Sequence, residues 1–265
     1  MRNGKIGLQG ILFDAKSSYM RGPALAPPLI RNAYKSDSAN YFSESGIELR
    51  PNVFNDLGDF TIDDYFDIEK ITVRNLGPKQ PLITLGGDHS ITYPILKAVT
   101  DQYGPVNILH IDAHSDLYYE FEGDKYSHAC PFARIMEEEL ANRLVQIGIR
   151  TLSTHQKEQA DKFEVEILAM KDFDSIPDFN EPIYLSLDID ALDPAFAPGV
   201  SHHEPGGLST REVLQIIQKI EVPIIGADIV EYNPKRDING VTAMVCAKFL
   251  KEITAKIIEK KPKYF

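Results

Sequence analysis

Three side chains that can bind a metal ion or carry a proton follow one apolar segment at every second position. The apolar segment covers residues 106–112 and runs into HIDAHSD (110–116), which contains Asp112, His114 and Asp116. Because alternate residues of an extended chain point to the same side, these three side chains are predicted to project from one face at the end of a strand. Carboxylates and imidazoles placed together in this way are suited to binding divalent cations.

Three other apolar segments also end in residues of this kind. One ends in SLDID, where Asp188 and Asp190 repeat the spacing of two. Another leads into GGDHS, which supplies His89 behind two glycines that let backbone and ligand approach closely. The last of the three ends near Glu231. In parallel sheets, ligands bind at the carboxyl ends of the strands, so these ends are predicted to form one site.

These segments offer more ligands than a single catalytic zinc uses, which is usually three protein side chains. The predicted metal ligands are four carboxylates and two imidazoles: His89, Asp112, His114, Asp116, Asp188 and Asp190. Two divalent cations about 3.5–4 Å apart would offset the cost of burying these charges and activate a shared water. The oxygen-rich set favours Mn²⁺ over zinc or copper. A single Asp-x-His is more often a turn, but two such patterns at strand ends favour a binuclear site.

The other histidines and the glutamate leave further interpretations open. His110 lies inside an apolar segment and is expected to be a packed, hydrogen-bonded core residue. His128, in YSHACPF, would by itself be a surface or capping histidine. His202 and His203 are adjacent and should point apart, so their loop is expected to line the site rather than bind metal. Glu231 could meet solvent at a strand end, although its place beside the metal ligands favours the pocket.

Short apolar segments alternate with helical patterns along the chain. Seven β-branched segments are predicted strands buried on both faces: 5–13, 80–87, 106–112, 143–149, 165–170, 182–190 and 222–232. Ser209 and Glu212 form a capping box before an amphipathic helix, and a long last helix is expected from about Gly240. This alternation predicts a single α/β domain over residues 1–265, with three layers in which a mostly parallel sheet has helices on both faces.

Composition limits the classes of partner. The 265 residues include 39 acidic and 28 basic side chains, a net charge of −11, which argues against nucleic acid because phosphate binding requires a basic surface. The two cysteines, Cys130 and Cys246, lack metal or redox spacing, which is typical of a reducing compartment. No signal-peptide core and no apolar stretch of about 18 residues occurs. We therefore expect a cytoplasmic protein without a membrane partner.

Three longer motifs resemble a known family. The sequences GGDHS (86–90), DAHSD (112–116) and SLDIDALDPAFAPG (186–199) resemble the signature segments of the ureohydrolases, which include arginases, agmatinases and guanidinobutyrases. The similarity extends from about Lys5 to the C-terminal helix and includes RGPALAPPLIR and GADIVEYNP. The resemblance implies an arginase/deacetylase-like fold, two manganese ions per subunit and a homo-oligomer, commonly a trimer or hexamer.

The resemblance also implies roles for individual residues. The residues that match the ligands of one manganese are His89, Asp112, Asp116 and Asp190, and those near the other are His114, Asp112, Asp116 and Asp188. His128 matches the proton-shuttling histidine of the family, and Glu231 matches the glutamate that pairs with the substrate guanidinium. Asp116 would orient a hydroxide held between the ions as it attacks the guanidinium carbon, and His128 would protonate the leaving amine before urea departs.

The loop from Tyr118 to His128 is expected to distinguish arginine from agmatine, which lacks the carboxylate. FEGDKYSHA and VSHHEPGG look like the corresponding parts of plant-type arginases and their bacterial relatives. Asp124, however, would repel a carboxylate where plant-type arginases tend to have asparagine, although Lys125 and Ser127 could compensate. The prediction is therefore agmatine, cleaved to putrescine and urea.

Several alternatives to agmatinase remain open. Arginase is the first, giving ornithine and urea from L-arginine, and guanidinobutyrase is the second. A zinc deacetylase-like enzyme or an inactive metal-binding protein would belong to a different class. The predicted substrate contacts are Asp124, Ser127, His202 and Glu231.

Overall fold

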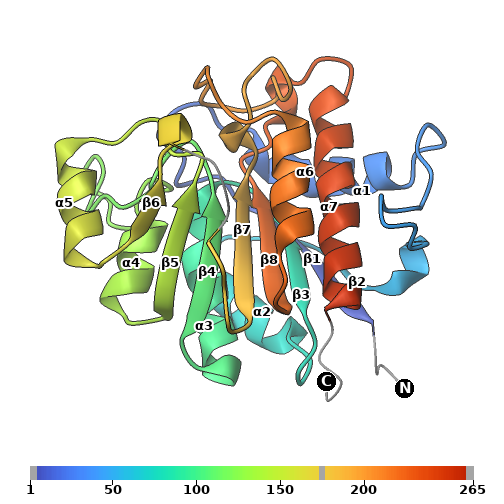
Figure 1. Ribbon diagram of the computed structural model, residues 1–265, viewed down its shortest axis with the longest axis horizontal. Helices are drawn as coiled ribbons and strands as arrows, with labels where there is room; N and C mark the ends of the chain where they lie inside the picture. The colour runs from blue at the N-terminus through green and yellow to red at the C-terminus, as the bar shows by residue number, and fades with distance from the viewer. Residues whose placement is uncertain (1–4, 173–176, 261–265) are drawn as a thin grey trace.

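Eight parallel strands form one sheet in the computed structural model, which describes residues 5–172 and 177–260 (Figure 1). Their order across the sheet is β2-β1-β3-β8-β7-β4-β5-β6. The strands are β1 (Ile6–Leu12), β2 (Phe54–Thr61), β3 (Leu82–Leu85), β4 (Val106–Ile111), β5 (Ala141–Ile147), β6 (Glu166–Leu168), β7 (Ile183–Asp188) and β8 (Ile224–Val230). The helices are α1 (Ala26–Tyr34), α2 (Asp67–Asn75), α3 (Thr92–Tyr103), α4 (Pro131–Glu137), α5 (Thr154–Lys162), α6 (Thr210–Lys219) and α7 (Val241–Glu259).

The four central strands are buried along their whole length, because helices cover the sheet on both sides. Every residue of β3, β8, β7 and β4 is buried. Apolar strands without alternation are what a parallel sheet covered on both faces requires. The predicted three-layer α/β fold is confirmed, and each of the seven predicted strands is present with small differences at its ends.

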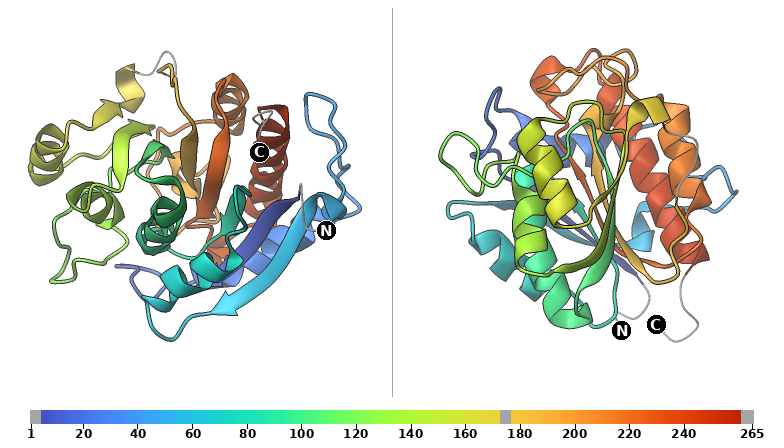
Figure 2. Two further views of the ribbon diagram at one scale, coloured as in Figure 1. Left: turned by 90° about the horizontal axis from the view of Figure 1, so that it is seen from below. Right: turned by 60° about the vertical axis from the view of Figure 1, so that its left-hand side comes forward.

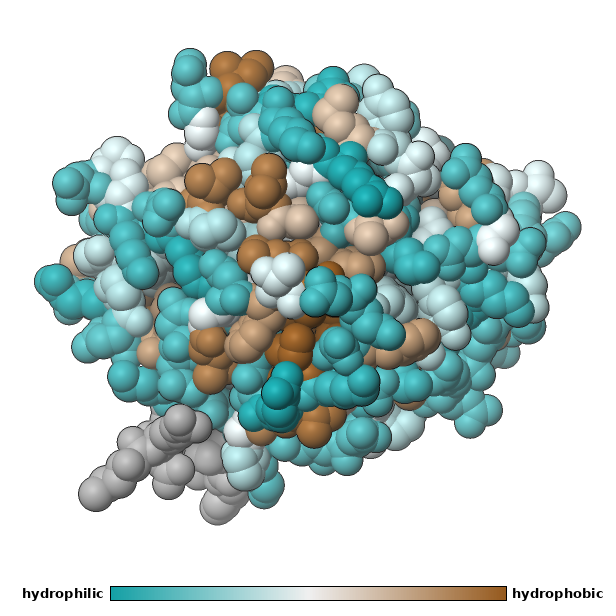
Figure 3. Space-filling model, turned by 180° about the vertical axis from the view of Figure 1, so that it is seen from behind, coloured by the Kyte–Doolittle hydropathy of each residue, from teal (hydrophilic) through white to brown (hydrophobic). Residues whose placement is uncertain are grey.

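Helices α1, α6 and α7 cover one face of the sheet, and α2, α3 and α4 cover the other (Figure 2). The first face packs through residues such as Ile217 of α6 and Phe249 of α7. The second packs through residues such as Leu96 of α3 and Phe132 of α4. Seen from behind, the surface carries apolar side chains in small groups between hydrophilic ones (Figure 3). Among the described residues, no helix is both long and apolar enough to cross a membrane.

The sequence did not predict β2, which is the edge strand beside β1. Its sequence, FNDLGDFT, contains two aspartates and a glycine, and most of its residues are partly or fully exposed. Strands of this polarity lack the apolar signal of the central strands. Asp56 and Asp59 instead pair with Arg31 of α1, which anchors the edge of the sheet to the helix layer.

The two predicted helix features are confirmed. The Ser209 hydroxyl accepts a hydrogen bond from the Glu212 backbone at 3.2 Å, and the Glu212 carboxylate accepts one from the Ser209 backbone at 2.7 Å, so the capping box starts α6. Gly240 precedes α7 with φ of 73°, a left-handed conformation that glycine adopts without strain.

The strand register brings the carboxyl ends of four neighbouring strands to one edge of the sheet. Leu85 of β3 pairs with Ile229 of β8, which also pairs with Leu187 of β7, and Leu187 pairs with Ile111 of β4. The residues that follow these positions are the ones predicted to do chemistry. The fold therefore places four distant sequence segments side by side.

Candidate metal centre and active site

The first ligand cluster surrounds the imidazole of His89. The Nδ1 atom of His89 lies 3.1 Å from Asp112 Oδ2, 3.2 Å from Asp116 Oδ2 and 3.1 Å from Asp188 Oδ2. All four side chains are buried, yet His89 Nδ1 forms no hydrogen bond. A buried nitrogen lone pair facing three carboxylate oxygens fits a divalent cation, which would bind all four atoms at once.

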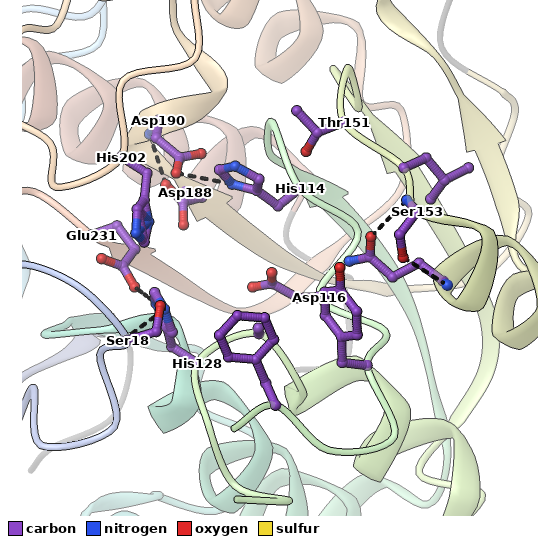
Figure 4. A pocket seen from close by; sticks show the side chains of 15 residues that line it. Ser18, His114, Asp116, His128, Thr151, Ser153, Asp188, Asp190, His202 and Glu231 are labelled. Carbon is purple, nitrogen blue, oxygen red and sulfur yellow. Dashed lines mark hydrogen bonds and ion pairs between the residues drawn. The ribbon is translucent and has the colours of Figure 1, made fainter. Parts of the chain in front are cut away.

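The second cluster shares Asp112 with the first. His114 Nδ1 lies 3.1 Å from Asp190 Oδ2 (Figure 4). It also lies 3.5 Å from Asp112 Oδ1. Asp112 thus turns one oxygen toward each cluster, as a bridging ligand of two cations does. Asp188 lies beside His89, and Asp190 lies beside His114. The family resemblance implied the opposite pairing, with Asp190 beside His89 and Asp188 beside His114.

The pKa shifts in both clusters indicate an excess of buried negative charge. Burial, together with Asp190 and Asp112, raises the pKa of Asp188 well above its usual range, and burial also raises the pKa of Asp190. Burial acts to lower the pKa of His89, but the three neighbouring carboxylates raise it well above its usual value. Shifts in this direction are expected where several buried carboxylates lie close together, and a pair of divalent cations would offset this negative charge.

The local backbone does not form the extended ladder that the spacing of two predicted. Strand β4 ends at Ile111, and Asp116 has a left-handed backbone with φ of 49°. Asp188 ends β7, while Asp190 lies in the short 3₁₀ helix η5 (Ile189–Ala191). The side chains converge because the chain turns at each strand end, and not because alternate residues share a face. The prediction of a common site was thus reached from the wrong local geometry.

A buried hydrogen-bond chain fixes the orientation of His89. Its Nε2 atom lies 2.9 Å from Ser186 Oγ, and Ser186 Oγ donates to Asp228 Oδ1 at 2.7 Å. Thr92 and Tyr184 also donate to Asp228, at 2.9 and 2.8 Å. Because the Ser186 proton is directed at Asp228, His89 must donate from Nε2, which leaves the Nδ1 lone pair for a cation. The sequence reasoning missed Asp228, although a charged residue inside the apolar run IIGADIV was a usable signal.

His110 holds Asp112 in place from within β4. Its Nε2 atom donates to Asp112 Oδ2 at 2.8 Å, while its Nδ1 atom accepts from Gln146 at 3.0 Å. The ring is fully buried and stacks on Phe132 with centroids 3.9 Å apart. Burial lowers the pKa of His110 and keeps the ring neutral, so it acts as a hydrogen-bond donor. The structure confirms the expectation that it is a packed, hydrogen-bonded core residue.

His128 and Glu231 form a pair on the wall of the site. His128 Nδ1 lies 2.8 Å from Glu231 Oε1, which also accepts a hydrogen bond from the His89 backbone at 2.9 Å. On its other side, His128 Nε2 lies 2.8 Å from Ser18 Oγ. Burial acts to raise the pKa of Glu231, but His128 lowers it, so the carboxylate is ionised at neutral pH. Glu231 has φ of 63°, an unusual conformation that turns its side chain into the pocket.

A cavity of about 460 Å³ opens over the two clusters. The predicted site residues that line it are His114, Asp116, His128, Asp188, Asp190, His202 and Glu231. His89 and Asp112 lie beneath it as part of the ligand clusters. His202 stands on the wall between His114 and His128, with ring centroids 6.0 and 5.4 Å away. The cavity thus joins the metal-type clusters to the His128–Glu231 pair.

Asp124 and Ser127 are absent from the lining of this cavity. Asp124 accepts an ion-pair contact from Lys16 at 2.6 Å and a backbone hydrogen bond from Tyr126 at 2.8 Å. Ser127 is buried, and its hydroxyl accepts from the Ala129 backbone. The expectation that Asp124 repels a substrate carboxylate therefore has no geometric basis, because Lys16 neutralises its charge outside the cavity.

Several residues that line the cavity were not predicted. Ser18 follows β1, and Thr151, Ser153 and Gln156 follow β5. Both segments come after strands that the sequence did predict. The rule that ligands meet the carboxyl ends of parallel strands would have found them, had it been applied to every strand rather than to the charged ends alone.

The parallel sheet carries at its carboxyl edge two carboxylate–imidazole clusters that could hold divalent cations, an arrangement suited to hydrolysis. Residues 4–255 match the model of the Arginase family, and the chain belongs to this family. The family assignment agrees with the ureohydrolase resemblance of the three sequence motifs.

Similarity to individual proteins extends over nearly the whole chain. Arginase 1, mitochondrial, of Arabidopsis thaliana is 45% identical over 274 residues, covering 94% of this chain and 80% of that protein. The arginase from Medicago truncatula superposes with a TM-score of 0.87 at 41% identity, covering 96% of this chain and 87% of that one. The agmatine ureohydrolase of Thermoplasma volcanium superposes with a TM-score of 0.84 at 33% identity, covering 97% and 90%.

Proposed function

We propose that this protein is an arginase, which hydrolyses L-arginine to ornithine and urea with two manganese ions per subunit. The observation that carries the proposal is the joining of two carboxylate–imidazole clusters and the His128–Glu231 pair in one cavity. The relatives named arginases support arginine over agmatine, which the sequence had favoured.

Six side chains would hold the two ions. The proposed ligands are His89, Asp112, Asp116 and Asp188 for one ion, and His114, Asp112 and Asp190 for the other. Bound divalent cations supply Lewis-acid charge and lower the pKa of a water molecule. The chain contributes a rigid frame for this chemistry, since His110 and Ser186 hold the innermost ligands by hydrogen bonds.

Glu231 is the proposed partner of the substrate guanidinium. Its Oε1 atom is already engaged by His128 and the His89 backbone, whereas Oε2 has no hydrogen-bond partner among the described residues. A planar guanidinium presents parallel N–H groups that fit a carboxylate. Because Glu231 is ionised and buried, its attraction for a cation is weakly screened by solvent. It would hold the guanidinium carbon above the two clusters.

His128 is the proposed general acid, which protonates the amine that leaves the guanidinium carbon. Burial acts to lower its pKa, but the adjacent Glu231 carboxylate raises it to about 9. At neutral pH the ring therefore takes up a proton readily, as a group that must deliver one requires. Asp116 lines the same cavity and is proposed to orient the attacking oxygen by accepting its hydrogen bond.

The amino acid end of arginine would meet neutral hydrogen-bonding groups. Thr151 and Ser153 line the cavity on the side away from Glu231 (Figure 4), and together with Gln156, which also lines it, they offer hydroxyl and amide donors for a carboxylate. Agmatine is the second candidate, since no lysine or arginine lines the cavity within the described part of the chain. The similarity to an agmatine ureohydrolase also favours keeping it in the test.

Urea release by the manganese-loaded protein tests the proposal across arginine, agmatine, 4-guanidinobutyrate and guanidine. We expect the highest kcat/KM for L-arginine and a content of two manganese ions per chain. A higher kcat/KM for agmatine would replace arginase by agmatinase. One zinc per chain with deacetylase activity and no urea would contradict the assignment of a ureohydrolase. The homo-oligomer stays a prediction, and so does the cytoplasmic location, because the Arabidopsis relative is named mitochondrial.

A further inference from the structure

The loop after β1 brings a serine hydroxyl onto the imidazole of His128. Ser18 Oγ lies 2.8 Å from His128 Nε2, and the Ser18 backbone N–H donates to the same nitrogen at 3.1 Å. The opposite nitrogen, Nδ1, lies 2.8 Å from Glu231 Oε1. Carboxylate, imidazole and hydroxyl therefore form one continuous chain (Figure 4).

The hydrogen bonds assign the protons along this chain. A backbone N–H can only donate, so Nε2 of His128 accepts from Ser18, and the ring carries its proton at Nδ1, where it faces Glu231. Both ring nitrogens are thus occupied. Ser18 lines the cavity and its Oγ atom contacts Nε2, so this hydroxyl offers a route for a proton that moves between Nε2 and the cavity.

Ser18 is the exposed end of this hydrogen-bonded series of three side chains. His128 is 8% exposed and Glu231 is 4% exposed, whereas Ser18 belongs to the exposed residues and lines the cavity. A hydroxyl can accept one proton while it donates another, so it can pass a proton without changing its own charge. The contact thus connects a buried acid–base group to solvent and substrate.

The position of Ser18 is fixed by its neighbours. The Lys16 backbone N–H and the Ser17 hydroxyl both donate to the buried carboxylate of Asp88, at 3.0 and 3.2 Å. The Lys16 carbonyl accepts from the His128 backbone at 3.2 Å, and the Lys16 ammonium pairs with Asp124 at 2.6 Å. Four contacts of the two preceding residues therefore tie this loop to the rest of the site, and the Ser18–His128 distance does not depend on Ser18 alone.

We infer that Ser18 is a proton-relay and positioning residue, which passes protons between His128 Nε2 and the cavity during the proposed ureohydrolase reaction. In the step that releases product, the doubly protonated form of His128 gives its Nε2 proton to Ser18 Oγ while Ser18 gives its own proton to the leaving amine, which returns His128 to the neutral form in which Nε2 accepts. The amine gains one proton, His128 loses one and Ser18 is unchanged. The reverse transfer, from a water molecule or a buffer acid through Ser18, returns a proton to His128 Nε2. This inference rests on the proposed function.

Replacing Ser18 by alanine tests the relay, since Ser18→Ala removes the hydroxyl but keeps the backbone N–H that contacts His128. We expect kcat for urea release to fall about 10-fold or more with little change in KM, because general acid–base transfer typically contributes 10²–10⁴-fold. Small buffer acids such as imidazolium should restore part of the kcat of Ser18→Ala in proportion to their concentration. Ser18→Thr, which keeps a hydroxyl, should retain most of the rate.

Ser17→Ala is the matched control, because it removes a hydroxyl from the same loop that contacts Asp88 and not His128. A second measurement needs no turnover: diethylpyrocarbonate modifies unprotonated imidazole nitrogens, and mass spectrometry of the His128 peptide gives its rate of modification. We expect faster modification in Ser18→Ala than in the unmodified protein or Ser17→Ala, because Nε2 loses one of its two partners.

Three outcomes would overturn the relay. The first is an unchanged kcat in Ser18→Ala, and the second is a lowered kcat that neither Ser18→Thr nor added buffer acid restores. The third is an unchanged rate of His128 modification. A lack of urea release by the unmodified, manganese-loaded protein from every guanidino compound would instead refute the proposed function, and the relay with it. Failure of the relay alone leaves the unmodified protein active, so the two failures are distinguishable.

Discussion

Substituting Asp228 by asparagine should weaken metal binding, although Asp228 belongs to neither ligand cluster. Asparagine has the same shape but replaces one carboxylate oxygen by an N–H donor. The Ser186 hydroxyl would then accept from Asn and turn its own proton toward His89 Nε2, 2.9 Å away. The His89 proton would move to Nδ1, where it faces three carboxylates and competes with the cation.

The magnitude follows from the position of Asp228 in the chain of hydrogen bonds. Loss of a partner that orients a metal-binding histidine typically costs about 10–100-fold in metal affinity. Tenfold corresponds to about 1.4 kcal/mol, so the metal-loaded protein should lose about 1.4–2.8 kcal/mol of stability relative to the metal-free form. The metal-free protein should change less, because the new amide keeps hydrogen bonds to this buried site and removes a buried charge.

Metal titration by calorimetry and denaturant unfolding with and without manganese would measure both effects. Thr92→Val is the matched control, because it removes a donor to the same carboxylate, 2.9 Å from Asp228 Oδ2, without touching the Ser186–His89 contact. Its manganese affinity should stay within about threefold of that of the unmodified protein, since no partner of a ligand is lost. Equal manganese affinity in Asp228→Asn and the unmodified protein would refute the reasoning.

Three further predictions concern the ligands, the acid and the helix layer. Asp112→Ala should abolish manganese loading and urea release together, because Asp112 contributes an oxygen to both clusters; full turnover by this variant would contradict the metal assignment. His128→Asn should keep both ions, as measured by elemental analysis, yet its kcat should fall about 10²–10⁴-fold. Unchanged kinetics in this variant would refute the role of His128 as the general acid. Hydrogen bonds from Arg211 and Gln218 lower the pKa of Glu44 from 4.5 to about 2. The ion pair of Glu44 with Arg211 should therefore stabilise the fold above pH 4.5, and this contribution should be lost as the pH falls toward 2. Glu44→Gln should therefore cost up to about 1 kcal/mol at pH 7 and nothing near pH 2, a small value because the pair is partly exposed; equal costs at both pH values would show that the charge is not involved.

Much of the fold was predictable because the central strands carry a strong local signal. Strands β3, β4, β7 and β8 are apolar at nearly every position, which only a sheet covered on both faces explains. Strand β2 carries no such signal, because its sequence is polar and its aspartates pair with Arg31. Position at the edge is not by itself the reason, since β6 lies at the opposite edge and was predicted from the apolar segment 165–170.

The chemical nature of the site was predictable from residue type. His114, Asp188 and Asp190 stand at the ends of apolar segments, where uncompensated charge signals a ligand, and the structure brings them together in one cavity. Asp124 shows the limit of this reasoning. Its charge suggested repulsion of a carboxylate, but Lys16, 108 positions earlier, neutralises it. Sequence gives the sign of a charge and not the identity of its partner.

The sequence by itself determined the class of chemistry: two groups of carboxylates and imidazoles at the ends of buried parallel strands, in motifs that resemble the ureohydrolases. Only the tertiary structure decided which aspartate accompanies which histidine, that Asp228 directs the His89 proton, and that Ser18 contacts His128. The physical reason is that periodicity fixes directions over a few residues, whereas these contacts join segments 42 to 110 positions apart. Strand order and loop anchoring set such distances, and both depend on the packing of the whole sheet.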